Sequence, residues 1–289
     1  MFALLTRDLN QCFGLGVAGN FAGHLEQAGE AVDFANVTAA APQAPKGIFP
    51  FYAPGDESFL GTFPLSHDRI AKPASASPVN LQIEPEAGLL CDVSYSPDGS
   101  VARLSAVAIG AFNDCSIRRP NARKISEKKN WGPDSKGVAA AFFAVTDIER
   151  GGPTRSLRIA CFLGRNGQTR AYGVDSPLSG YSYYGRQLLD WIGERINHQR
   201  GAENTPLEDV GGLLAGCGSP ERLLIGIGAT RYTELGASTY LQAGDQSIVV
   251  VYDSDELSPR ELERAIERHR DGELVAASIL RQTVYDAPG

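Results

Sequence analysis

Apolar and alternating runs occupy much of the chain from about residue 79 onward. They are found at residues 81–95, 101–112, 138–148, 156–163, 223–228 and 247–253. Short runs that are apolar throughout, or that alternate with a period of two, are typical of strands. The pattern predicts a β-dominated fold of the α+β class, with few helices.

Helical periodicity is clear in two segments. Residues 183–198 place five large apolar side chains on one face: Leu188, Leu189, Trp191, Ile192 and Ile196. Residues 258–270 open with Ser-Pro-Arg-Glu, which gives an N-cap serine, a proline at the first helical position and a glutamate at the third. This combination is a capping box. The charged composition of the second segment predicts a surface helix appended to the core.

A glycine-rich strand and long loops are predicted for the first 80 residues. Residues 12–19 have the pattern of a buried strand, and Asn20 is a suitable N-cap for a short helix from residue 21 to about residue 29. The Gly-x-Gly-x-x-Gly pattern at residues 14–19 does not indicate a dinucleotide fold, because no βαβ unit with an acidic strand end follows within ~20 residues. Proline and glycine at residues 35–80 predict ordered loops and short edge strands.

The overall composition narrows the class of protein and of partner. The 289 residues are 43% hydrophobic and 21% charged, which excludes disordered and fibrous classes. The net charge is −7 and no basic run exceeds two residues, so we expect no nucleic acid or anionic membrane as partner. The expected partner is a small molecule or another protein.

The N-terminus and the cysteines predict a cytosolic protein. Charge arrives at Arg7 and Asp8, too early for the apolar region of a signal peptide, and no stretch approaches the ~18 apolar residues of a membrane span. The five cysteines are scattered and form no Cys-x-x-Cys pair. They are therefore expected to be reduced thiols rather than a disulfide framework or a zinc site.

Three acidic residues are candidate metal ligands. Glu84 and Glu86 are two residues apart, so they point to the same face of an extended strand, and Asp114 follows 28 residues after Glu86 in a second apolar run. Carboxylate oxygens suit Mg²⁺, Mn²⁺ or Ca²⁺ better than Zn²⁺ or copper. The alternative is a solvated strand face with no metal.

Several motifs together resemble those of the fumarylacetoacetate hydrolase superfamily. Residues 19–26, Gly-Asn-Phe-Ala-Gly-His-Leu-Glu, look like its Gly-x-Asn-Tyr-x-x-His-x-x-Glu segment. Residues 84–86 resemble its Glu-x-Glu motif, and residues 113–118 its Asn-Asp-x-Ser-x-Arg motif. Residues 131–137 are similar to the segment that presents its active-site lysine, and residues 228–245 to its Gly-Thr-Pro and Tyr-Leu-x-x-Gly-Asp pair. The order and intervals agree over residues 13–253, which indicates a divergent member.

The resemblance implies a mixed β-roll with peripheral helices in a single domain. In this division, residues 1–75 are a loop-rich segment that carries the histidine motif. Residues 76–253 are the metal-binding β-roll core, and residues 254–289 are an appended helix and tail. No internal repeat or linker interrupts the chain.

The resemblance also implies a divalent cation, Mg²⁺, Mn²⁺ or Ca²⁺, held by Glu84, Glu86 and Asp114. The open coordination positions would bind a chelating 1,3-dioxo or 2-oxo acid. His24 would be the base that, paired with a carboxylate, activates water.

The chain departs from the superfamily beside this histidine. The usual glutamate three residues after the histidine is Gln27 here, and the nearest acids are Glu26 and Glu30. We expect Glu26 to take its place on spacing. If Glu26 does not reach His24, hydrolysis gives way to tautomerisation or decarboxylation, which demand less of that pair.

The remaining candidates are basic or hydroxylic. Arg118 would clamp a substrate carboxylate or enolate, or else form a structural salt bridge to a metal-site acid. Lys136 matches the superfamily lysine, which would stabilise developing negative charge, and Lys128 and Lys129 are its rivals. Thr230 is a candidate for substrate carboxylate binding, with a turn role as the alternative.

A second superfamily lysine, after a Pro-x-x-Phe segment, is missing from this chain. Its absence indicates a more aromatic pocket.

The predicted function is metal-dependent hydrolysis of a C–C bond in a 1,3-dioxo acid, through an enolate. The alternatives are an isomerase, tautomerase or decarboxylase of a 2-oxo acid, and a catalytically inactive metal- or ligand-binding protein. The resemblance also implies a homodimer.

Overall fold

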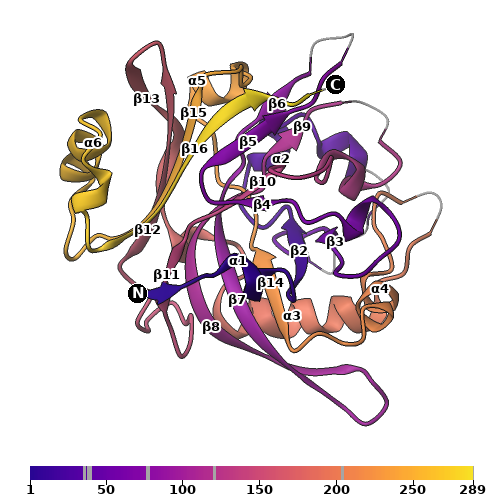
Figure 1. Cartoon of the computed structure of the whole chain (residues 1–289). Helices are drawn as coiled ribbons and strands as arrows, with labels where there is room; N and C mark the ends of the chain where they lie inside the picture. The colour runs from indigo at the N-terminus through magenta and orange to yellow at the C-terminus, as the bar shows by residue number, and fades with distance from the viewer. Residues whose placement is uncertain (35–36, 38–40, 76–78, 120–121, 203–204, 289) are drawn as a thin grey trace.

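Two β-sheets pack together in the computed structural model, which describes residues 1–34, 37, 41–75, 79–119, 122–202 and 205–288 (Figure 1). The first sheet has nine strands in the described residues. Seven of them follow the order β1 (Phe2–Ala3), β11 (Ala141–Ala144), β8 (Val101–Asn113), β7 (Pro85–Tyr95), β14 (Arg222–Gly226), β2 (Phe13–Ala18) and β3 (Gly47–Tyr52). The other two are β10 (Lys136–Val138), which pairs with β8, and β4 (Leu65–Ser66), which pairs with β10.

The second sheet has five strands among the described residues. Their order is β13 (Gln168–Pro177), β12 (Leu157–Arg165), β15 (Gln246–Asp253), β16 (Ala277–Asp286) and β5 (Arg69–Lys72). A short ladder of β6 (Leu81–Gln82) and β9 (Ser116–Ile117) completes the sheet structure that the model describes.

The described helices are short apart from two. The α-helices are α1 (Thr6–Leu9), α2 (His24–Gln27), α3 (Gly185–His198), α4 (Val210–Gly216), α5 (Glu234–Ser238) and α6 (Pro259–Glu267). Turns of 3₁₀-helix are η1 (Ala31–Phe34), η2 (Phe59–Gly61), η3 (Ile125–Lys128), η4 (Leu178–Gly180) and η5 (Asp271–Glu273). None of the helices in these ranges is long and apolar enough to cross a membrane.

The central strands of the second sheet are buried on both faces. Along β15, Val249 and Val251 belong to the main core between the sheets, whereas Ile248 and Val250 belong to a second cluster. This alternation follows from the two-residue period of a strand. The second cluster is closed by apolar side chains of α6, which lies on the outer side of this sheet (Figure 1).

The fold class predicted from the sequence is confirmed, and so are its two main helices. The five apolar side chains of residues 183–198 are buried in α3. Helix α6 has the predicted capping box, in which the Ser258 hydroxyl accepts from the Glu261 N–H and the Glu261 side chain accepts from the Ser258 N–H. The expected tail is wrong for residues 277–286, because β16 is hydrogen-bonded between β15 and β5 and not peripheral.

The glycines of β2 serve close packing. A Cβ atom on Gly14 would lie 2.2 Å from the Phe51 ring, and one on Gly16 would lie 2.3 Å from the Phe49 ring. These rings come from the neighbouring strand β3, which ends the order of the first sheet and therefore tolerates Pro50. The glycines thus allow two aromatic rings to pack directly on β2. One of these rings, Phe49, also lines a cavity beside Glu84 and Glu86.

Candidate functional site

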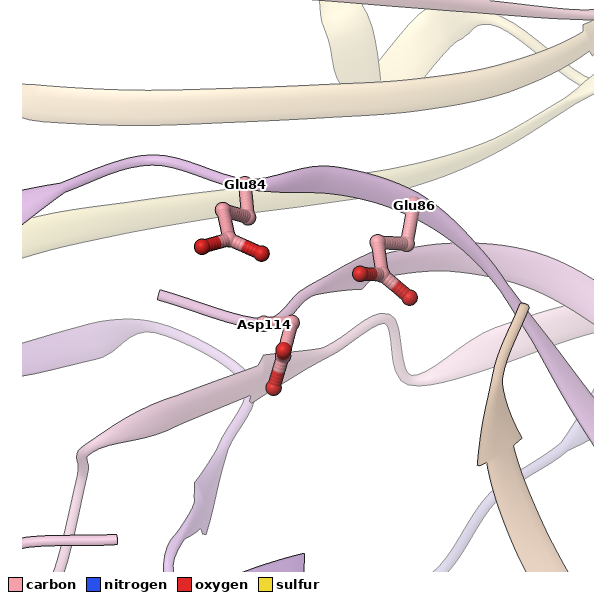
Figure 2. A group of neighbouring side chains, drawn as sticks. All are labelled: Glu84, Glu86 and Asp114. Carbon is pink, nitrogen blue, oxygen red and sulfur yellow. The ribbon is translucent and has the colours of Figure 1, made fainter. Parts of the chain in front are cut away.

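Three buried carboxylates meet where β7 and β8 pair. Glu84 and Glu86 flank the start of β7, and Asp114 directly follows β8 (Figure 2). The Asp114 N–H donates to the Glu84 carbonyl at 3.0 Å, which fixes the two segments side by side. One ligand atom from each carboxylate lies within 4.8 Å of the others, and each side chain is at most 3% exposed. The two-residue spacing thus places both glutamates on one face, as predicted.

Buried cations surround this triad. The Lys129 ammonium lies 2.8 Å from Glu84 Oε2 and 2.5 Å from Asp114 Oδ2. The Lys136 ammonium lies 3.0 Å from Asp114 Oδ1. Glu86 differs from its neighbours: its Oε2 accepts the Gly228 N–H at 2.9 Å, and no ion pair of the described residues involves it. Burial, together with the charges of Asp114 and Glu84, raises the pKa of Glu86 well above its ordinary value.

Lys136 uses its ammonium within the protein. It donates to the carbonyls of Asp114 and Cys115 at 3.1 and 2.5 Å, and its side chain is fully buried. Together with the ion pair to Asp114, these bonds commit the ammonium to groups of the protein. Lys136 therefore lies against Asp114, whereas its rival Lys129 lines the cavity.

Arg118 is held by four side chains. Its Nη1 lies 2.7 Å from Glu84 Oε1 and 2.7 Å from Glu30 Oε1. Its Nε donates to Gln82 Oε1 at 2.6 Å, and its Nη2 donates to the Tyr232 hydroxyl at 3.0 Å. These contacts are those expected if Arg118 forms a structural salt bridge to a metal-site acid, the second of the two roles predicted for it. A role in substrate binding stays a prediction.

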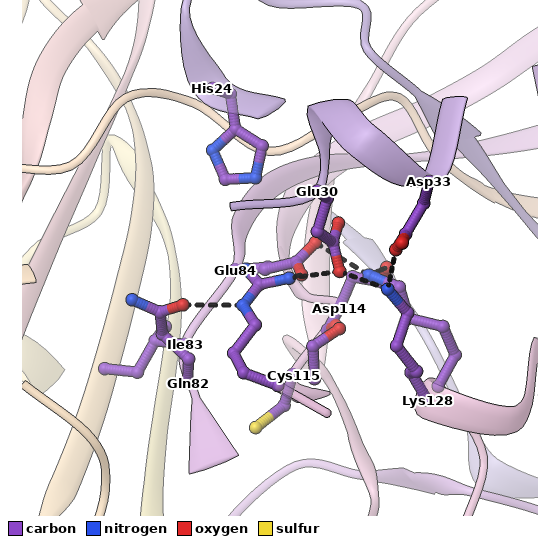
Figure 3. A network of polar contacts seen from close by, with 12 residues as sticks. His24, Glu30, Asp33, Gln82, Ile83, Glu84, Asp114, Cys115 and Lys128 are labelled. Carbon is purple, nitrogen blue, oxygen red and sulfur yellow. Dashed lines mark hydrogen bonds and ion pairs between the residues drawn. The ribbon is translucent and has the colours of Figure 1, made fainter. Parts of the chain in front are cut away.

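Glu30 joins the site from the N-terminal segment. Its Oε1 pairs with Lys128 at 2.7 Å in addition to Arg118, and Lys128 also pairs with Asp33 at 2.8 Å (Figure 3). Burial alone would raise the pKa of Glu30, but the nearby charges of Arg118, Lys129 and Lys128 outweigh it and lower that pKa to about 2. Glu30 is therefore ionised at neutral pH.

His24 is positioned by a backbone carbonyl. Its Nδ1 lies 2.9 Å from the Thr230 carbonyl oxygen, which can only accept, so Nδ1 carries the proton. Its Nε2 is buried and has no hydrogen-bond partner among the described residues. Burial lowers the pKa of His24 to about 4. The imidazole is thus neutral at physiological pH, with the lone pair of Nε2 free.

The expectation that Glu26 supports His24 is not met by the geometry. Glu26 is exposed and lines a hollow on the outside of α2, apart from the cavity that His24 lines. Gln27 is engaged with the backbone of Tyr232. The predicted helix over residues 21–29 is shortened to α2, and the chain reverses at Gly29, whose φ is +70°. Glu30 is therefore the acid of this segment that enters the site.

Thr230 also acts locally. Its side chain is 1% exposed, its N–H donates to the Pro85 carbonyl at 3.0 Å, and its own carbonyl holds His24. These bonds position the histidine. Substrate binding by Thr230 stays a prediction.

A small cavity joins the histidine to the acids. Its free volume is about 20 Å³, enough for one ion or one water molecule. The polar side chains that line it are His24, Glu30, Glu84, Glu86 and Lys129; apolar residues, among them Phe34, Phe49 and Ile125, complete the wall.

The donor set of the triad fits a divalent cation. Both carboxylate oxygens of Asp114 and the Oε1 of Glu84 are buried without an aligned hydrogen bond among the described residues, although cations lie near them. Hard oxygen ligands with unused lone pairs are what Mg²⁺, Mn²⁺ and Ca²⁺ require. The structure thus supports a buried acidic site of the predicted composition.

Comparison with known proteins now identifies the family. Residues 30–284 match the model of a family of unknown function, DUF5718. The chain belongs to this family. No curated protein matches the sequence significantly.

Solved structures relate this DUF5718 chain to a known fold. The crystal structure of Cg1458 with an inhibitor is 16% identical, with a TM-score of 0.54, over 95% of this chain and 77% of that chain. A putative fumarylacetoacetate hydrolase family protein from Yersinia pestis CO92 is 14% identical, with a TM-score of 0.47, over 83% and 88%. At these identities the likeness concerns the fold alone, and the first comparison carries it. The chain therefore shares the fold of Cg1458.

Some residues of the DUF5718 site were missed from the sequence. Gln82 continues the alternation of Glu84 and Glu86 by two residues, so strand periodicity could have found it. No periodicity in the sequence marks Asp33 or Tyr232 as a residue of the site. They reach the site through the turn after α2 and through the loop after β14, which only the folded chain brings together.

Proposed function

We propose that the chain is a divalent-metal-dependent enzyme that moves a proton on an enolisable 2-oxo acid, as an isomerase or tautomerase. The observation that carries this proposal is the free Nε2 of the neutral His24 in a cavity that Glu84 and Glu86 also line. A base and a candidate cation site thus share one small space.

Glu84, Glu86 and Asp114 would hold the ion, and we propose Mg²⁺ or Mn²⁺, with Ca²⁺ as the alternative. When bound, such an ion polarises a substrate carbonyl and stabilises the negative charge of its enolate. The ammonium of Lys129 adds a positive charge at the same wall of the cavity.

The properties of His24 favour proton transfer over hydrolysis. With a pKa of about 4 it is a weak base, which suits a carbon acid already acidified by a neighbouring carbonyl better than water. Its Nδ1 faces the Thr230 carbonyl and not a carboxylate, so the pair that would activate water is not formed. Glu30 is committed to Arg118 and Lys128. Hydrolysis of a C–C bond, preferred on the sequence alone, is therefore less well supported, and decarboxylation stays the near alternative.

A non-catalytic metal- or ligand-binding protein is the second candidate. This candidate is favoured by Arg118 and Lys136, because each of them donates its hydrogen bonds to other groups of the protein. On this view the cavity would bind an ion or a small acid without turnover. Cytosolic location and a homodimeric state, both predicted from the sequence, stay predictions.

The test is proton exchange and turnover with oxaloacetate, acylpyruvates and fumarylpyruvate in D₂O, with Mg²⁺ or Mn²⁺. We expect metal-dependent deuterium incorporation next to the 2-oxo group, reduced ~10²-fold or more in His24→Gln, because a positioned base contributes about that factor. His198→Gln, at the exposed end of α3, is the matched control and should keep the rate. Cleavage products instead of exchange would identify a hydrolase or decarboxylase, and inertness across the panel would favour the binding protein.

A further inference from the structure

Every carboxylate oxygen of Glu84 and Asp114 already faces a cationic nitrogen. Arg118 lies at Oε1 of Glu84, Lys136 lies at Oδ1 of Asp114, and Lys129 lies at the remaining oxygen of each acid. Of these three cations, Lys129 is the one that bridges the two acids. It is also the one that lines the cavity.

The position of Lys129 is built by its surroundings. It follows the turn η3 directly, its side chain is 2% exposed, and its ammonium lies 5.2 Å from the centre of the Phe49 ring. Gly16 lets that ring approach β2, since a Cβ there would collide with it. A buried lysine stem between an aromatic ring and two acids has little freedom to point elsewhere while both ion pairs are formed.

A divalent ion would need the same oxygens. Hard cations bind carboxylate oxygens at ~2.0 to 2.6 Å, so an ion shared by Glu84 and Asp114 must lie between them. The Lys129 ammonium now occupies a position between those two acids, at 2.8 and 2.5 Å. Two cations that close together would repel strongly in a buried site, where screening by solvent is weak.

We propose that Lys129 is an internal competitor for the metal site, so that a divalent ion binds only when the Lys129 ammonium withdraws from Glu84 and Asp114. This inference rests on the proposed function, because it assigns a role toward the ion proposed there. The unpartnered Nε2 of His24, in a side chain 4% exposed, is an independent sign that this cavity receives a ligand.

Glu30 offers the displaced ammonium a second acceptor. It lines the same cavity as Lys129, and Arg118 and Lys128 both pair with its Oε1. Movement of Lys129 toward Glu30 would keep its charge paired while the triad takes the ion. Ion binding and the lysine position are thus coupled, and the affinity for the ion is lowered by the cost of displacing the lysine.

The test compares metal affinities of the full-length protein and two variants by calorimetric titration with Mn²⁺ and Mg²⁺. Lys129→Met removes the competing charge and keeps a similar stem, and we expect a dissociation constant lower by roughly ten-fold or more. Lys124→Met is the matched control: it removes a positive charge from the same segment, but the Lys124 ammonium donates to the backbone carbonyls of Ala202, Thr205 and Leu207. The dissociation constant of this variant should stay within about three-fold of the wild type.

The outcomes separate the inference from the function it rests on. Equal or weaker binding by Lys129→Met, or an equal gain in Lys124→Met, overturns the role of Lys129 and leaves the metal site standing. No binding by either the wild type or Lys129→Met removes the metal from the proposed function and the inference with it.

A second measurement covers the case in which Lys129→Met does not fold. In crystals of the wild type soaked with Mn²⁺, located by anomalous scattering, the Lys129 Nζ should lie more than about 4 Å from both Glu84 Oε2 and Asp114 Oδ2. An ion in the triad with either lysine contact retained overturns the proposal.

Discussion

Replacing Glu30 with glutamine should destabilise the protein at neutral pH, and the structure sets the size of the effect. The pKa of Glu30 is lowered from 4.5 to about 2 by the neighbouring Arg118, Lys129 and Lys128, against the opposing effect of burial. At ~1.36 kcal/mol for each tenfold change in acidity, the ionised form contributes about 3 kcal/mol to the free energy of unfolding. This contribution agrees with the cost of about 3 to 5 kcal/mol that typically follows removal of one partner from a buried ion pair.

The pH dependence of this effect has a defined sign. A carboxyl group whose pKa is lower in the folded state contributes its full stability above its unfolded pKa, 4.5, and loses it as the pH falls toward 2. The difference between wild type and Glu30→Gln should therefore shrink from about 3 kcal/mol at pH 7 to about 2 kcal/mol at pH 3.5.

Urea unfolding followed by circular dichroism measures both quantities. Glu26→Gln is the matched control, because Glu26 lies in the same segment but is exposed and outside the cavity, and its effect should stay below about 0.5 kcal/mol. Equal effects of the two variants at pH 7, or a Glu30→Gln difference that does not change with pH, would refute the assignment of Glu30 to the buried network.

Two further predictions concern residues that pack behind the site, Glu208 beside η3 and Gly16 beside Phe49. Burial raises the pKa of Glu208, whose Oε1 accepts the Ser126 N–H, to about 7. Because the folded state holds that proton more tightly, the stability of the wild type relative to Glu208→Gln should fall by about 2 to 3 kcal/mol between pH 5 and pH 8 in urea unfolding, and a constant difference would contradict it. Gly16→Ala should cost about 1 to 3 kcal/mol in thermal or urea unfolding, because its Cβ would collide with Phe49. Gly151→Ala, with no atom within 4 Å of its Cβ, should cost little, and an equal loss in both would exclude the collision as the cause.

The sequence determined those parts of the site that depend on local periodicity. Glu84 and Glu86 share a face because strand side chains alternate, and this holds wherever the strand lies. The capping box that begins α6 and the apolar face of α3 are local for the same reason. The order of the motifs then related the chain to a fold in which Asp114 faces these two acids.

Tertiary structure alone decided which charged residues complete the site. Spacing along the chain favoured Glu26 over Glu30, but Glu30 enters the site because of where α2 ends and how the chain reverses at Gly29. Likewise, Lys129 reaches the triad because η3 packs beside it, whereas Lys128, one residue earlier, turns to Glu30. Ion pairs between residues distant in sequence are set by the packing of whole elements, because spacing along the chain carries no information about which loop closes over which strand.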